Sequence, residues 1–177
     1  MILTDREIQL SIENKLIEIA PIPTEDSYSA TSLDLTLGKT FIEWMELPGQ
    51  PIRPHDGGYR YSQLTNRQKK IENDRYELNP RSFVLGWTEE KIALPVSSKI
   101  AARIEGKSSI ARLGVGIHVT APTIHAGFVG RIQLEIFNFG PNCIELDAGM
   151  KICQLIFETT LGTPSSGYQG MFLNQQG

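Results

Sequence analysis

Three short apolar runs follow one another in the stretch FVLGWTEEKIALPVSSKIAARI, which spans residues 83–104. Each run has the length of a β-strand, and similar runs follow at 115–119, 132–137 and 152–157, bounded by Gly, Pro or Asn. Many short strands separated by turn signals are typical of sandwiches, jelly rolls and barrels, whereas a parallel sheet requires strands that alternate with helices. The sequence therefore predicts a mainly β protein.

The first residues of the chain predict one short helix. Thr4 and Glu7 fit a capping box, in which each side chain satisfies a backbone N–H at the start of a helix. Apolar residues then recur at four-residue spacing, which gives one apolar stripe: Ile8, Ile12 and Leu16. Pro21 and Pro23 follow, and we expect the helix to have ended before them.

Residues 32–38 show the alternation of a half-buried strand, with leucines at every second position and Gly38 at the end. Residues 48–80 are polar, with few aliphatic side chains, and we interpret them as a long loop or an edge excursion. The basic run 67–70 within this segment is predicted to be a solvated face rather than a phosphate site.

Length and charge limit the possible functions. The 177 residues carry a formal net charge of −3 and are 40% hydrophobic. A chain of this size can bury a core without disulfides, so we expect a single domain over 1–177. The pI of about 5.6 argues against nucleic-acid or membrane partners, which usually meet a basic face. Any anionic ligand must be held by a local cluster of cations and amides.

Cysteine usage and the N-terminus indicate the compartment. Cys143 and Cys153 lie ten residues apart with no Cys-x-x-Cys pair, so we predict two buried thiols and neither a zinc site nor a disulfide. The N-terminus is charged by its fifth residue, which is unlike a signal peptide, and no apolar run approaches the ~20 residues of a membrane span. The expected location is the cytoplasm.

The densest group of charged and hydroxyl side chains lies at 103–114, directly after a predicted strand. Its cations Lys107 and Arg112 flank Ser108 and Ser109, which together offer the donors that a phosphate group needs. A P-loop is excluded, because that motif requires Gly at position 101, where this chain has Ala. A capped turn with incidental charges explains the composition equally well.

Glu135 lies in an apolar stretch between Leu134 and Ile136. A buried carboxylate is costly unless it is paired, and an enclosed one can act as a general base. Strict alternation favours the alternative that Gln133 and Glu135 share a solvent face while their apolar neighbours face the core. The same polar face could also line a site.

Two histidines, His118 and His125, lie between these two groups. Neither has a His or Cys nearby in sequence that would complete a metal site, and structural roles are the simpler interpretation. The His-x-Glu and Pro-Cys-x-x-Cys signature of zinc deaminases is absent, as is the Gly-x-Ser-x-Gly elbow of serine hydrolases.

Taken together, these segments resemble the dCTP deaminases of the deaminase and dUTPase superfamily. The resemblance is carried, in the family's order, by residues 1–8, 32–38, 106–114, 118–121, 127–130, 134–135, 149–155 and 168–170. It implies a distorted β-barrel or jelly roll of the dUTPase type with a short N-terminal helix. It also implies a homotrimer whose active sites are shared between subunits.

The activity implied by the resemblance is hydrolytic deamination of dCTP to dUTP and ammonia, which feeds dUMP and dTTP synthesis. In the family, the residue matching Glu135 is the general base that activates water. Residues matching Ser108 and Arg112 support that water and the developing charge, and the backbone at Ala121 helps to hold the water. Mg²⁺ is held by the triphosphate, and zinc is not used.

The substrate-binding set implied by the resemblance is Lys107, Ser108, Ser109, Arg112, Thr120, His125, Phe128, Gln133, Leu134, Tyr168 and Gln175. In the family, the residues that match Gln133 and Leu134 read the base through their main chain. The tail residues that match Tyr168 and Gln175 fold over the phosphates. The expected partner is a nucleotide, with dCTP first and dUTP or dTTP as alternatives.

Two positions depart from the family pattern. His125 stands where the family carries an Asp that contacts the sugar, and Met171 stands where a tail Lys is expected. One alternative function is a bifunctional dCTP deaminase and dUTP diphosphatase that yields dUMP. His125 weakens this alternative, because dUTPases use that Asp to activate water. Another alternative is a non-catalytic nucleotide-binding trimer, which would have no need of Glu135 or Arg112.

Overall fold

A computed structural model of the chain describes residues 1–46, 48–49, 51–52 and 61–170, with the side chains of 61–63 left out. The helices are α1 (Asp5–Glu13) and α2 (Ser108–Ala111), and short 3₁₀ turns are η1 (Glu25–Ser27), η2 (Tyr61–Arg67) and η3 (Val96–Ser98). The strands are β1 (Glu18–Ala20), β2 (Tyr28–Ser29), β3 (Ser32–Trp44), β4 (Gln68–Glu72), β5 (Arg75–Leu78), β6 (Phe83–Ala93), β7 (Ile100–Gly106), β8 (Val115–Ile117), β9 (Thr123–Ile124), β10 (Val129–Asn138), β11 (Ile144–Asp147) and β12 (Lys151–Thr159).

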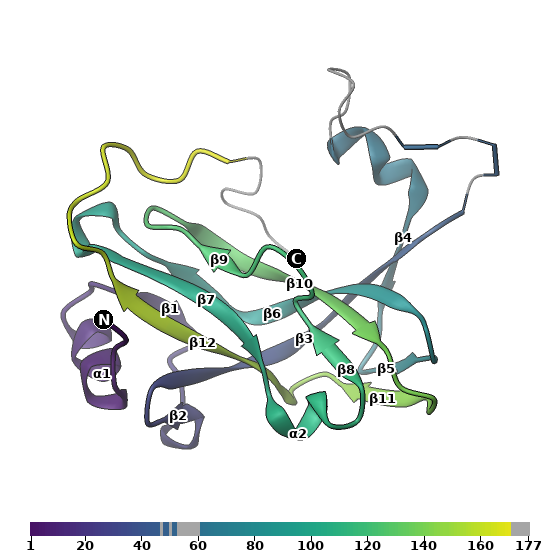
Figure 1. Ribbon diagram of the computed structural model, residues 1–177, viewed down its shortest axis with the longest axis horizontal. Coiled ribbons are helices and arrows are strands. Elements are labelled where there is room, and N and C mark those ends of the chain that lie inside the picture. Colours follow the sequence, from purple (N-terminus) through teal and green to yellow (C-terminus); the bar gives the residue numbers. More distant parts are fainter. Residues whose placement is uncertain (47, 50, 53–60, 171–177) are drawn as a thin grey trace.

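One curved, ten-stranded sheet dominates the molecule, and its main path runs β8-β10-β6-β3-β12-β7-β9 (Figure 1). The long strand β3 joins the two halves, because its first part pairs with β12 and its later part pairs with β6 and β4. A separate two-stranded ladder is formed by β5 and β11. The predicted mainly β fold, a distorted barrel with one short N-terminal helix, is confirmed.

The core lies inside the curve of the sheet and consists mainly of strand side chains, to which Ile8 of α1 and Ile110 of α2 are added. Along β10, buried and half-buried residues alternate without a break, so that Ile132, Leu134 and Ile136 enter the core. This is the pattern that alternation predicted, since successive side chains of a strand point to opposite faces. Arg131, Gln133 and Glu135 therefore share the opposite face, whereas the polar Asn138 at the end of the strand is buried.

The N-terminal helix is shorter than the sequence indicated. It ends at Glu13, and the chain turns at Lys15, whose φ is +58°. Because of this turn, the Ile17 side chain is buried in the core, whereas Leu16, the last residue of the predicted apolar stripe, is exposed. The predicted capping box is also wrong: the Thr4 side chain makes no capping hydrogen bond and instead meets the Glu7 carboxylate through its hydroxyl.

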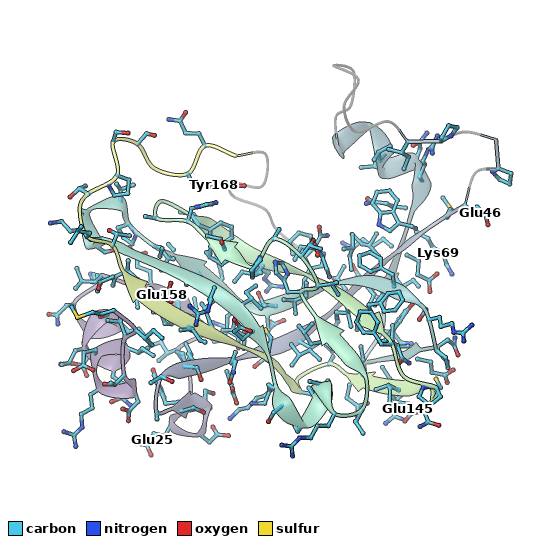
Figure 2. The ribbon with its side chains drawn as sticks, in the orientation of Figure 1. Glu25, Glu46, Lys69, Glu145, Glu158 and Tyr168 are labelled. Atoms are coloured by element: carbon cyan, nitrogen blue, oxygen red, sulfur yellow. The ribbon has the colours of Figure 1, made fainter. Side chains whose placement is uncertain are left out.

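The described part of segment 48–80 contains regular structure from residue 61 onward, so the edge excursion rather than the long loop is observed there. Strands β4 and β5 follow the turn η2, and β4 extends the β3 edge into an arm that projects from the body of the protein (Figure 1). The basic run lies on β4, where Lys69 and Lys70 form exposed ion pairs with Glu43 and Glu72 at 3.4 and 3.3 Å. Lys69 is labelled on this arm in Figure 2. The solvated face predicted for the basic run is thus observed.

Cys153 is buried, as predicted, but Cys143 is exposed, because it sits in the turn before β11 and outside the sheet core. Over the described ranges, no three His, Cys, Asp or Glu side chains are grouped as a metal site requires. In that same part of the chain, no helix has the length and apolar character needed to span a membrane.

Candidate active site

A cavity of about 470 Å³ opens over the outer face of β10. Gln133 and Glu135 line it from β10, and the turn after β8 adds His118 and Ala121. The alternation along β10 gives the cavity its polar groups, because the side chains that do not enter the core face this space. The polar face that the sequence predicted therefore lines a cavity.

The Glu135 carboxylate is anchored through one of its two oxygens. The backbone N–H and the hydroxyl of Thr120 both donate to Oε2, at 2.9 and 2.7 Å. Among the described residues, no hydrogen bond is made to Oε1. Two donors on one oxygen orient the group and leave the other oxygen to accept a proton or a water molecule.

The turn 118–121 wraps around Glu135. The N–H groups of His118 and Val119 donate to the Glu135 carbonyl oxygen at 2.7 and 3.3 Å, and β8 ends before them at Ile117. The prediction of a strand up to Val119 is wrong, because His118 and Ala121 adopt positive φ values of 57° and 46°. His118 Nε2 lies 2.9 Å from the Ala121 carbonyl oxygen, which can only accept, so Nε2 carries the proton.

The second end of the cavity is aromatic. The rings of His125 and Tyr168 stack with their centroids 5.6 Å apart and their planes at 14°, and Phe128 lies 6.2 Å from Tyr168. Tyr168 belongs to the C-terminal segment, which passes above β9 in Figure 2. Its N–H donates to the Ala126 carbonyl oxygen at 3.0 Å. The tail is thus docked on the cavity.

Gly127 makes this docking possible. Its φ is +89°, and a Cβ there would lie 2.6 Å from Tyr168 N and 2.7 Å from Gly167 Cα. Only glycine fits both the conformation and the close approach.

The Leu134 side chain is fully buried on the core side and does not line the cavity. Its main-chain N–H and C=O face Gly86 of β6, because the Glu135 carbonyl oxygen accepts from His118 on the β8 side and successive residues of a strand point these groups to opposite edges. The main-chain role expected for Gln133 stays a prediction.

The residues expected around the triphosphate do not line this cavity in a single chain. Ser108, Ser109 and Arg112 lie exposed on and after α2, at the far end of the sheet from the docked tail (Figure 1). Lys107 precedes α2 and forms an ion pair with Asp34, whose side chain is only 8% exposed. Asp34 Oδ1 is buried and has no hydrogen-bond partner in the described structure.

Sequence reasoning missed Asp34 and three apolar residues of the cavity wall: Trp44, Phe83 and Leu85. The only signal for Asp34 was a carboxylate between leucines on a predicted strand. The apolar residues gave no signal, because they meet Glu135 only through strand pairing across the sheet. Gln175 and Met171 lie outside the described residues.

A family model described as dCTP deaminase-like matches residues 2–160. The chain belongs to this family. It is 37% identical over 174 residues to a dCTP deaminase of Rhodospirillum rubrum, covering 95% of this chain and 87% of the relative. It is 39% identical over 159 residues to a protein of Methanothermobacter thermautotrophicus named dCTP deaminase, dUMP-forming, covering 89% and 79%.

Solved structures support the fold. A 2′-deoxycytidine 5′-triphosphate deaminase from Agrobacterium tumefaciens matches with a TM-score of 0.70 and 22% identity over 90% of this chain. This chain spans 48% of that longer chain. A dUTPase from phage phi11 matches with a TM-score of 0.53 and 11% identity, covering 88% of this chain and 97% of the dUTPase. Members of the dCTP deaminase-like family thus share the fold of dUTPases.

Proposed function

We propose that the protein deaminates dCTP by hydrolysis, with Glu135 as the general base. The observation that carries the proposal is the Glu135 carboxylate itself, which lines the cavity and is fixed by Thr120 through Oε2 alone. Membership of the dCTP deaminase-like family and the names of the relatives supply the substrate class.

The reaction requires a water molecule to add to C4 of cytosine. Oε1 of Glu135 takes a proton from the water as the oxygen bonds to C4, and the proton passes to the amino nitrogen. The C4–N bond then breaks, ammonia leaves, and the proton remaining on the added oxygen moves to N3, so that the ring becomes uracil. The Ala121 carbonyl, which already accepts from His118 Nε2, is the second group that can hold the water in place. Fixed dipoles of this kind stabilise developing charge without reorganising.

The proposed triphosphate contacts come from a neighbouring subunit of a homotrimer. Lys107, Ser108, Ser109 and Arg112 form one group that one protomer does not bring to its own cavity, as a site shared between subunits would require. Mg²⁺ would accompany the triphosphate, and the mechanism uses no zinc. The exposed Phe139, whose ring lies 4.4 Å from that of Phe137, marks an apolar surface beside Glu135 for such a neighbour.

Tyr168, His125 and Phe128 would hold the sugar end of the nucleotide, and the docked tail would exclude water during the reaction. Thr120 acts by positioning Glu135. Gln133 lines the cavity and would lie beside the base, where a group held on a rigid strand gives discrimination between cytosine and uracil at little entropic cost. Cytoplasmic location and a single domain over 1–177 stay predictions.

A second candidate is deamination followed by cleavage of dUTP to dUMP and pyrophosphate. The names of relatives such as the Methanothermobacter protein, which is 39% identical, favour it. His125 in place of the family's Asp argues against the second step. The third possibility, nucleotide binding without turnover, leaves the anchored Glu135 without a role.

The test is incubation of the purified protein with dCTP and Mg²⁺, with assays for ammonia and for each nucleotide product. We expect ammonia together with dUTP; dUMP in place of dUTP would select the second candidate. Glu135→Gln should lower kcat by about 10²- to 10⁴-fold, the usual contribution of a general base. Glu18→Gln, an exposed change on β1, is the matched control and should leave kcat unchanged. Nucleotide binding without ammonia would refute the proposal.

A further inference from the structure

The ion pair with Asp34 sets Lys107 apart from the other residues proposed to contact the triphosphate. The side chains of Ser108, Ser109 and Arg112 are exposed, and within the described chain they make no hydrogen bond or ion pair. The Lys107 side chain is 24% exposed, and its ammonium group meets the Asp34 carboxylate. In this group it is therefore Lys107 whose side chain already has a protein partner in the described structure.

Strand register explains how the pair forms across 73 residues of chain. Asp34 of β3 is the cross-strand partner of Gln154 of β12, and Gln154 is in turn the partner of Glu105 of β7. Lys107 lies two residues beyond Glu105 and therefore projects to the same face. The sheet thus places the Asp34 carboxylate beside the start of α2.

The Asp34 carboxylate has no second anchor. Oδ2 contacts Lys107, whereas Oδ1 is buried and has no partner in the described structure, although the residue is only 7% exposed. The buried carboxylate of Glu90 differs, because the backbone N–H of Thr36 donates to both of its oxygens. A buried acceptor without a partner destabilises a fold. A structural hydrogen-bond network therefore does not explain Asp34, and its one contact is with Lys107.

A phosphate group that binds Lys107 must share this cation with Asp34. An ammonium group has three donors, but a phosphate at Lys107 would bring a second negative charge close to a buried carboxylate. Such repulsion is screened much less than repulsion between exposed charges. The two anions therefore compete for Lys107.

We propose that Asp34 is an internal competitor of the nucleotide, which holds Lys107 in the free protein and thereby weakens binding of the triphosphate. This inference rests on the proposed function, in which Lys107 contacts the phosphates. Asp34 touches no substrate and acts through Lys107, so it is a positioning residue. Its effect depends on the ligand: a triphosphate has to displace the carboxylate, whereas a nucleoside without phosphate does not.

The first experiment measures Kd for dCTP with Mg²⁺ by calorimetry, on a Glu135→Gln background that prevents turnover. Deoxycytidine, which has no phosphate, is measured as a competitor of dCTP. A hydrogen bond to a charged group corresponds to about 10- to 150-fold in an equilibrium constant, and the amide oxygen of asparagine keeps a weaker contact with Lys107. We therefore expect Asp34→Asn to lower Kd for dCTP by about tenfold and to leave Kd for deoxycytidine unchanged.

Asp74→Asn is the matched control. It makes the same change in an exposed ion pair, that of Asp74 with Lys39, and should alter neither constant. An unchanged or higher Kd for dCTP in Asp34→Asn, or an equal gain for deoxycytidine, overturns this inference while turnover of dCTP by the wild-type protein leaves the proposed function standing. If the wild-type protein neither binds dCTP nor releases ammonia, both fail.

The second experiment asks whether the effect passes through Lys107. On a Lys107→Met background, Asp34→Asn should lower Kd for dCTP by no more than about threefold, the size of the repulsion through water that remains. A tenfold gain that persists without Lys107 overturns the inference. Thermal melts report whether each variant is folded. If Asp34→Asn does not fold, Asp34→Thr, which is neutral and suited to a strand, takes its place with the same expectations.

Discussion

Replacing Gly127 by alanine should release the C-terminal tail from the cavity. The new Cβ would lie 2.6 Å from Tyr168 N and 2.7 Å from Gly167 Cα, distances at which the tail backbone must move. The movement breaks the hydrogen bond from Tyr168 N–H to the Ala126 carbonyl oxygen and separates the Tyr168 ring from His125.

The magnitude follows from those contacts. A hydrogen bond contributes about 1 kcal/mol and an aromatic pair about 0.5–1.5 kcal/mol. Their loss, about 2 kcal/mol, corresponds to about a 30-fold larger population of undocked tail. The strain of alanine at a φ of +89° adds a global cost of about 1 kcal/mol, or about 2–4 °C in Tm for a domain of this size.

Chymotrypsin cleavage after Tyr168, followed by mass spectrometry, measures the undocked population, because cleavage tracks the open fraction when opening is fast. Three other glycines separate the causes. Gly149→Ala has the strain of a φ of +87° but no contact within 4 Å, and should lower Tm without changing cleavage. Gly162→Ala has neither a positive φ nor a contact within 4 Å, and should change neither Tm nor the cleavage rate. A Cβ at Gly167 would meet the Val96 side chain at 2.7 Å and Gly127 Cα at an ordinary 3.5 Å, so Gly167→Ala should raise cleavage less than Gly127→Ala.

If Gly127→Ala is cleaved no faster than Gly162→Ala, the docked tail described for this protein is wrong. If Gly149→Ala is cleaved as fast as Gly127→Ala, global strain rather than the local collision is responsible. In the proposed enzyme, release of the tail should also raise KM for the nucleotide more than it lowers kcat, since the tail closes over substrate and does not touch C4.

Three further predictions concern the site and its supports. Arg112→Ala and Glu135→Gln should each be inactive alone. Trimers reassembled from an equal mixture of the two variants should regain about a quarter of wild-type activity, because a shared site combines residues from two chains and about one site in four receives both intact residues. No recovery would contradict the shared site. Burial raises the pKa of the Glu90 carboxyl above 4.5, and the Thr36 N–H that bonds both its oxygens offsets this only in part. The folded state therefore binds this proton more tightly than the unfolded state, so the stability linked to it is present below pH 4.5 and lost as pH rises through the raised pKa. Urea unfolding should accordingly show Glu90→Gln gaining stability relative to wild type as pH rises above 4.5 and through the raised pKa, while Glu18→Gln shows no such trend. Iodoacetamide should modify the exposed Cys143 and leave native Cys153 intact, because burial both shields that thiol and raises its pKa; mass spectrometry of the native protein with two alkyl groups would refute this.

The hydrophobic periodicity of the sequence predicted which face of a strand each side chain occupies, because that depends only on neighbours in sequence. It placed Ile132, Leu134 and Ile136 in the core and Glu135 on the other face, and both placements hold. It failed where one residue with positive φ changed the path of the chain, as Lys15 does after α1 and His118 does after β8. A single sequence contains little information about such local conformations outside glycine.

The rest of the site depends on contacts between distant strands. Leu85 meets Glu135 across the β6–β10 ladder, and Asp34 meets Lys107 across 73 residues of chain. No spacing rule in the sequence encodes these pairs, because the register between strands is set by the packing of the whole sheet. The separation of Arg112 from Glu135 within one chain was likewise expected only from the family resemblance.

The ion pair between Lys107 and Asp34 has a consequence for how a nucleotide arrives. A cation joined to a carboxylate presents almost no net charge beyond a Debye length of about 8 Å, and the chain as a whole is negative at −3. We therefore expect Lys107 to contribute nothing to the diffusional capture of a triphosphate. Its effect should begin only after arrival, when phosphate oxygens replace Asp34, and should be seen as a longer residence time of the bound nucleotide.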